Sequence, residues 1–225
     1  MKLKILLTVE PEKESTRRKR GRPSANKDLS IVLEAAAKVC AKKGFDGAQI
    51  KEIAQEANFS ASLLHYHFSD KDDLWKKTVS KLGQDLLSKL EEIESYFKDL
   101  QGVPLFKAYN RQFIYFAAKN PELFKIAFHE IGNESPRAVW IIDEILNPVQ
   151  NQFSDNIFKR KDKGSDIPSE ISFAHIFTLL AGSANMFFAL SFQIKRQYGI
   201  DVYDDEEIDK YVDFINGTLF ARLEK

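Results

Sequence analysis

The sequence predicts an all-α protein of about nine helices, in which a small three-helix unit near the N-terminus precedes a larger helical bundle. Residues 50–74 read as two short helices joined by a tight turn and followed directly by a third. After residue 70, apolar residues recur at helical spacing, without strand-like alternation and without an internal repeat. The chain has 225 residues, of which 44% are hydrophobic and 29% charged. This composition suits one small and one larger globular domain.

The helix-turn-helix pattern of residues 50–74 begins with one apolar stripe. The members of the stripe recur at offsets of three and four and predict a helix over 49–57: Ile50, Ile53, Ala54 and Ala57. Asn58 accepts a positive φ at the turn, and the side chain of Ser60 can cap the next helix. Phe59, Leu64 and Phe68 are expected to pack between the two helices. The outward face of the second helix then consists of Ala61, Ser62, Leu63, His65, Tyr66 and His67.

A short helix with that exposed set predicts a binding surface. In helix-turn-helix proteins the second helix lies in the DNA major groove, and the first helix crosses the DNA backbone. The turn alone favours a simpler interpretation, in which it is a helical corner of a larger bundle. The sequence on either side of the turn changes that balance.

Between residues 32 and 74 the chain reads VLEAAAKVCAKKGF, then IKEIAQEANFSASLLHYHF, then DKDDL. This segment resembles the DNA-binding domain of the TetR-family transcriptional regulators. The resemblance covers about a fifth of the chain and requires several positions in register: Gly44, Phe45, Ile53, Ala54, Ser60, Leu64, Tyr66, Phe68 and Lys71.

The resemblance implies a set of DNA contacts on and around the second helix of the turn. Family members usually begin the first helix of the turn with Thr or Ser, whereas this chain has Gln49 as the substitute. They often have Gly where Ser62 stands and Tyr where His65 stands, so a different base sequence is expected to be read. The DNA-facing candidates are Gln49, Ser60, Ala61, Ser62, His65, Tyr66, His67 and Lys71. His65 and His67 point to different faces of a helix, so no metal site is expected.

Residues 1–27 are predicted to form a flexible basic arm. Residues 15–27, STRRKRGRPSANK, hold no large apolar residue, and Arg20-Gly21-Arg22-Pro23 resembles the core of an AT-hook, whose arginines enter the minor groove. Residues 15–71 contain eleven Lys and Arg against six Asp and Glu, a net +5, although the whole chain is neutral. We therefore interpret Arg20 and Arg22 as DNA contacts, against the alternative of a solvated basic tail.

The remaining chain divides into a domain at 28–74 and a helical ligand-binding and dimerisation domain at 75–225. Helices are predicted over 28–43, 70–97, 105–119, 121–131, 136–158, 171–198 and 204–223. Gly44 is expected to end the first of these. Gly102 and Pro104 are expected to end the segment that contains the fourth helix, and Pro148 is a candidate break. Cys40 falls on an apolar face, where an inert core residue is expected.

The apolar stretch at 171–194 contains many polar side chains and has no second span beside it, so an interface helix is favoured over a membrane helix. The resemblance implies a homodimer formed through 171–198 and 204–223. The apolar run near the N-terminus is too short for a signal peptide, which predicts a cytoplasmic protein.

The resemblance also implies a ligand cavity in the second domain, where aromatic residues are abundant. Aromatic walls with few polar groups suit an apolar or amphipathic small molecule. The candidate ligand contacts are Tyr109, Phe113, Phe116, Phe128, His129, Trp140, Phe177 and Asn185. Most aromatic residues are nevertheless expected to be ordinary core.

These patterns predict a homodimeric repressor that binds palindromic operator DNA and is released by a small-molecule effector, with the fourth helix as the mechanical link. No cofactor or metal is expected. Two alternatives stay open. One is an architectural protein that binds DNA without sequence preference, and the weaker one is a helical-bundle enzyme, although no nucleophile elbow, phosphate-binding glycine loop or metal-spaced cluster is present.

Overall fold

The computed structural model describes residues 25–157 and 172–221, and within these ranges the secondary structure is helical. The helices are α1 (Ala25–Gly47), α2 (Ile50–Glu56), α3 (Ala61–His67), α4 (Lys71–Tyr96), α5 (Gly102–Lys119), α6 (Pro121–Gly132), α7 (Pro136–Ile141), the π-helical turn η1 (Ile142–Leu146), α8 (Asn147–Ile157), α9 (Phe173–Ala189), α10 (Ser191–Tyr198) and α11 (Asp205–Phe220). The predicted all-α fold is confirmed.

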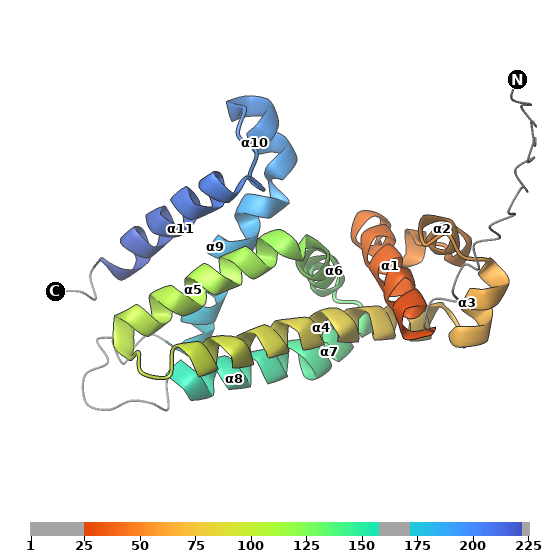
Figure 1. The fold of residues 1–225 in the computed structure, drawn as a ribbon, viewed down its shortest axis with the longest axis horizontal. Helices are drawn as coiled ribbons and strands as arrows, with labels where there is room; N and C mark the ends of the chain where they lie inside the picture. Colours follow the sequence, from red (N-terminus) through yellow and green to blue (C-terminus); the bar gives the residue numbers. More distant parts are fainter. Residues whose placement is uncertain (1–24, 158–171, 222–225) are drawn as a thin grey trace, which may run out of the picture.

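The long helix α4 connects the two ends of the molecule (Figure 1). Helices α1, α2 and α3 form a compact unit at the end where α4 begins, and α5, α7 and α8 run beside the rest of α4. Helix α9 packs on α5, and α11 lies along α5 and also contacts α9. One cluster of buried apolar side chains extends from α1 through α4 to α9. The predicted boundary at residue 74 therefore falls inside a helix that both parts share.

The first helix ends its regular course where the sequence predicted, at Gly44. This residue has φ 69° and ψ 173°, and one further turn follows it up to Gly47. The residue after it, Phe45, then lies edge-on against Trp75 of α4, with ring centroids 6.0 Å apart. Cys40 on the same helix is buried, and desolvation by burial raises the pKa of its thiol to about 11. The thiol is consequently neutral at physiological pH.

Several predicted helix limits were wrong. Gly102 and Pro104 do not separate α4 from a helix beginning at 105; they form the first turn of α5. A proline is tolerated there because the first N–H groups of a helix have no partner within it. Pro148 likewise lies in the first turn of α8, directly after the wider backbone of η1, and does not break the chain direction.

The predicted helix at 171–198 is two helices, α9 and α10, which meet at Leu190 with a bend of 58°. Leu190 has φ −91° and ψ 12°, outside the helical region. Among the described residues, no single helix combines the length and apolar character needed to cross a membrane, and this bent pair meets the length and composition test only when its two helices are taken together.

Candidate DNA-binding surface and effector pocket

The turn between α2 and α3 has the local geometry that its residues predict. Asn58 adopts φ 56°, and the Oγ atom of Ser60 accepts a hydrogen bond from the backbone N–H of Leu63 at 3.2 Å. Ile53 and Ala54 of α2 and Leu64 of α3 are buried against each other's helices and against α1. The cap and the apolar contacts fix the direction in which α3 leaves the turn.

The outward face of α3 is exposed along its length. Ser62, Leu63, His65 and Tyr66 are exposed, and the Tyr66 side chain is the most exposed large one in this unit at 82%. Ala61 and His67 are half-buried, and the His67 ring lies edge-on to Tyr66 with centroids 5.1 Å apart. A seven-residue helix that presents such side chains to solvent has a surface that can contact an extended partner.

Two further predicted DNA contacts lie beside α3, with different surroundings. Gln49 is the exposed N-cap residue of α2, and its side chain makes no cap hydrogen bond. Lys71, at the start of α4, donates from Nζ to the backbone oxygen of Asp46 at 3.3 Å, and its ammonium lies 4.5 Å from the centroid of the Phe45 ring. Lys71 therefore already ties α4 to the α1–α2 connection. Arg20 and Arg22 lie outside the described residues.

An ion pair between two helices of the bundle contacts the three-helix unit through its arginine. Glu130 of α6 is 2% exposed, and Arg137 of α7 donates from Nε to its Oε2 atom at 3.0 Å. Ser135 also donates to that carboxylate. The Arg137 guanidinium lies 3.7 Å from the centroid of the Phe45 ring and 3.8 Å from an Asp46 oxygen. We call this group, Phe45, Asp46, Glu130, Ser135 and Arg137, the joint.

One feature of the joint, the buried position of Glu130, can be inferred from the sequence. Glu130 continues the apolar stripe of Leu123, Ile126 and Ala127 at offsets of three and four, so a carboxylate occupies a buried position of α6. A buried carboxylate requires a charged or hydrogen-bonding partner. The sequence does not show that this partner is Arg137, or that Arg137 stacks on an aromatic ring of another helix.

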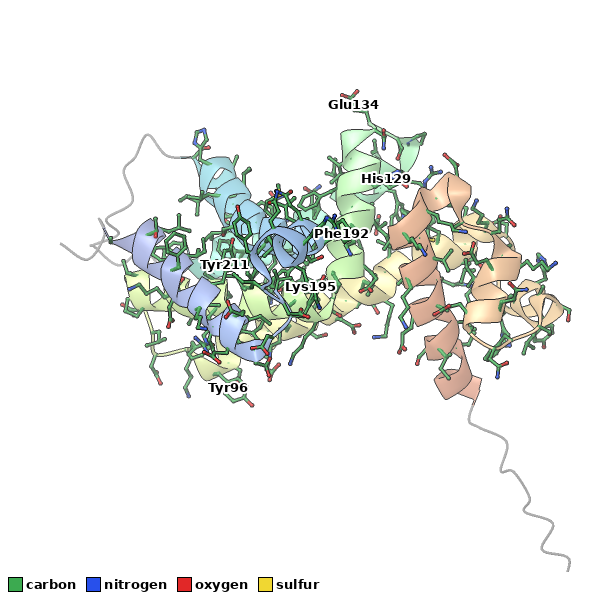
Figure 2. The ribbon with its side chains drawn as sticks, turned by 90° about the horizontal axis from the view of Figure 1, so that it is seen from above. Tyr96, His129, Glu134, Phe192, Lys195 and Tyr211 are labelled. Atoms are coloured by element: carbon green, nitrogen blue, oxygen red, sulfur yellow. The ribbon has the colours of Figure 1, made fainter. Side chains whose placement is uncertain are left out.

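Two of the predicted ligand contacts, His129 of α6 and Trp140 of α7, lie at the end of the bundle that contacts the three-helix unit. His129, which is labelled in Figure 2, lies near α1. A Cβ atom added to Gly44 would be only 2.7 Å from the Cε1 atom of His129. The Trp140 ring packs on Trp75, with centroids 5.5 Å apart. Both side chains therefore contact residues at the boundary between the two parts of the chain.

The other predicted ligand contacts are divided among three places. Tyr109, Phe113 and Phe177 line a cavity of about 20 Å³ enclosed by α4, α5, α8 and α9. Phe128 and Asn185 line a separate cavity of about 20 Å³ between α5, α6 and α9. Phe116 borders an open groove on the surface of α5. The eight side chains thus do not line one common cavity, and their role as ligand contacts stays a prediction.

The surface of α9, α10 and α11 exposes large apolar side chains. These are Leu179, Met186, Leu190, Phe192, Tyr198 and Phe214. Helix α11 is fixed to α9 because Tyr211 stacks on Phe187 with centroids 4.1 Å apart and donates to the Ser183 backbone oxygen at 2.6 Å. Figure 2 shows Phe192 and Tyr211 on this side of the bundle, away from α1 to α3. The predicted dimerisation segments thus present apolar surface outward.

Comparison with known proteins places the DNA-facing part of the chain in a family. Residues 32–77 match the model described as bacterial regulatory proteins, tetR family. The HTH-type nicotine-responsive transcriptional repressor HdnoR of Paenarthrobacter nicotinovorans is 26% identical over 72 residues, which are 32% of this chain. The matched segment spans 37% of that relative's length.

Solved structures extend the similarity over the whole fold. The fatty acid degradation regulator FadR from Bacillus halodurans superposes with a TM-score of 0.62 at 18% identity, covering 89% of this chain and 98% of that one. FadR from Bacillus subtilis, in complex with stearoyl-CoA, gives a TM-score of 0.60 at 16% identity, with coverages of 84% and 98%. The helix-turn-helix segment therefore matches the TetR family of transcriptional regulators, and the structural similarities show that the chain shares the fold of these solved structures.

Proposed function

We propose that this TetR-family regulator is a homodimeric repressor that binds a palindromic operator through α3 and leaves it when a small apolar or amphipathic molecule enters the bundle. The observation that carries the proposal is the exposed face of α3, with Ser60 and Ser62 at its N-terminal end, His65 in its last turn and Tyr66 82% exposed. Side chains at this end of a recognition helix reach base edges in the major groove.

The distribution of charge also supports DNA binding by the N-terminal part of the chain. Residues 15–71 carry a net charge of +5 in a chain that is neutral overall, so the DNA-facing part is basic and the rest acidic. Basic residues near the surface raise the affinity for any duplex because they displace counterions. In the proposal, Arg20 and Arg22 add minor-groove contacts beside the operator.

The first prediction separates phosphate contacts from base contacts on α3 and at the start of α4. Tyr66→Phe and Lys71→Ala should weaken binding to specific and scrambled duplexes by the same factor, because phosphates carry no sequence information. Ser62→Ala and His65→Ala should change the preferred sequence, at about 1–3 kcal/mol for each base contact. Selection of bound fragments from random DNA, followed by titration of wild type and variants, provides the measurement.

The outcome also tests the architectural alternative. A footprint confined to one palindrome supports an operator-binding repressor, whereas protection spread along unrelated duplexes supports non-specific binding. If all four substitutions weakened specific and scrambled DNA equally, α3 would not read bases and the proposal would be lost.

The homodimer is proposed on the apolar surface of α9 to α11. Met186 and Phe214 are 56% and 67% exposed, so each presents a large apolar side chain to solvent on a helix of the proposed interface. A second copy of the chain covers such a surface when the contact is symmetric. Two operator half-sites in a palindrome require that symmetry.

The second prediction tests this interface. Met186→Glu and Phe214→Glu should each weaken the dimer by roughly 2 kcal/mol or more, about thirtyfold in Kd, because a buried apolar contact becomes a buried charge. Val139→Glu on α7, at a position 61% exposed and outside the interface, is the matched control and should leave the dimer intact. Sedimentation equilibrium measures all three. Unchanged dimerisation in Phe214→Glu and Met186→Glu would rule this interface out.

The effector is proposed to enter between α4, α5, α8 and α9. The relative HdnoR is nicotine-responsive and a structural neighbour holds stearoyl-CoA, as their names state. The cavity of about 20 Å³ in this chain is the size of one water molecule, so Phe113 and Phe177 must move apart to admit a larger ligand. A ligand that binds only the open form shifts the protein towards that form. The open form is proposed to release DNA.

A further inference from the structure

The cavity between α4, α5, α8 and α9 contains an unusual polar residue. Asn110 of α5 is 1% exposed and forms part of the cavity wall, which is otherwise almost entirely apolar. Among the nine lining residues, only Asn110 and Tyr109 carry polar side-chain groups. A buried amide costs free energy unless both its donor and its acceptor are paired.

The orientation of the Asn110 amide is fixed by a second asparagine on α11. The Nδ2 atom of Asn216 donates to the backbone oxygen of Lys107 at 3.4 Å, which directs the Oδ1 atom of Asn216 towards Asn110. Asn110 must then present its own Nδ2 atom, which donates to Asn216 Oδ1 at 2.8 Å. The amide cannot be reversed without placing two oxygens against each other.

The side-chain oxygen of Asn110 is consequently left without a hydrogen-bond donor among the described residues. Its Oδ1 atom is fully buried and has no hydrogen-bond partner within the described part of the chain. A bound water molecule would need two to four polar partners, and the cavity wall offers few. A ligand with an apolar body and one donor group matches the wall better. Its donor pairs with the Asn110 oxygen, and its body contacts the apolar side chains.

We propose that the Oδ1 atom of Asn110 accepts a hydrogen bond from the effector, so the effector carries a neutral donor, a hydroxyl or an amide N–H, at one end of an apolar body. The inference rests on the proposed function, in which the effector enters this cavity. An ether or a carboxylate at the same position would place an oxygen acceptor against an oxygen acceptor. The site then selects alcohols and amides over ethers and free acids of the same length.

The experiment uses the full chain and two isomeric probes, 1-decanol and nonyl methyl ether, of which only the alcohol carries a hydrogen-bond donor. Isothermal titration calorimetry on the wild type should give at least about tenfold tighter binding of decanol, because the ether leaves the buried acceptor unpaired. Asn110→Leu removes the acceptor while keeping a similar volume, and it should abolish the preference for decanol.

A second variant tests the orientation of the amide. Asn216→Ala removes the hydrogen bond that fixes the Asn110 amide, so the amide can reverse and the preference for decanol should fall without disappearing. Equal binding of both probes to the wild type would overturn the inference and leave the proposed effector function standing. A preference for decanol that persisted in full in Asn110→Leu would also overturn it. Failure of both probes to bind would count against the proposed effector function itself.

Discussion

Arg137→Met is expected to lower the free energy of unfolding by about 3 kcal/mol. The substitution keeps an apolar side chain over the Phe45 ring but leaves the Glu130 carboxylate, which is 2% exposed, without its cation. The Ser135 hydroxyl and the neighbouring His129 ring then remain beside that charge. Removing one partner of a buried ion pair is costly because the other charge has already lost its water.

Urea unfolding at neutral pH measures this loss of stability. Two further variants serve as controls. The double substitution Glu130→Gln with Arg137→Met should recover much of the stability, since no unpaired charge then remains buried. Lys210→Met removes an exposed cation that pairs with Glu206 and Glu207 on α11, so it should cost much less. Equal losses in Arg137→Met and Lys210→Met would show that the joint contributes no more than a surface pair.

Gly44→Ala is the second substitution with a large expected effect, a loss of about 2 kcal/mol or more. At φ 69° and ψ 173° the backbone occupies a region that is almost restricted to glycine, and a side chain there costs about 1–3 kcal/mol. The new Cβ atom would also be 2.7 Å from Cε1 of His129, so that ring or α6 must shift.

The two contributions can be separated by thermal unfolding. Gly132→Ala, where a Cβ atom meets nothing within 4 Å, is the control and should be close to neutral. The double variant Gly44→Ala with His129→Ala removes the contact but keeps the backbone strain, so it should recover only part of the loss. A Gly44→Ala protein as stable as wild type would contradict the strained geometry of Gly44.

Local features of the fold were predictable because they depend on neighbours in the sequence. The positive φ of Asn58 and the cap by Ser60 follow from the residue types at those two positions. The start of α5 was not predictable in the same way. Gly102 and Pro104 are compatible both with the end of one helix and with the first turn of the next, and the packing of α5 against α4 and α9 decides between them.

The candidate sites show the same division. The exposed face of α3 follows from helical periodicity, so Ser62, His65 and Tyr66 could be selected from sequence. The cavity depends on how four helices meet, and aromatic composition alone did not distinguish Phe177, which lines it, from Trp140, which packs on Trp75. The role of Asn110 depends on Asn216, more than a hundred positions away.

The π-helical turn η1 keeps the buried side chains of α7 and α8 on the same face. The four buried side chains Ile141, Ile145, Val149 and Phe153 follow one another at intervals of four residues. In a regular α-helix, each interval of four turns a side chain about 40° past its predecessor, and three intervals would turn Phe153 roughly 120° away from Ile141. A wider turn absorbs part of that rotation.

The wider turn also fits a close approach. Ile145 lies against Gly83 of α4, where an added Cβ atom would be only 2.7 Å from the Ile145 Cδ1 atom. The segment from α7 to α8 therefore keeps one face on α4 over its whole length. Helix α8 contributes Val149 and Phe153 to the cavity wall, and α7 contains Arg137 of the joint. Because η1 connects α7 and α8 without a loop, a rotation of α8 about its axis also rotates α7.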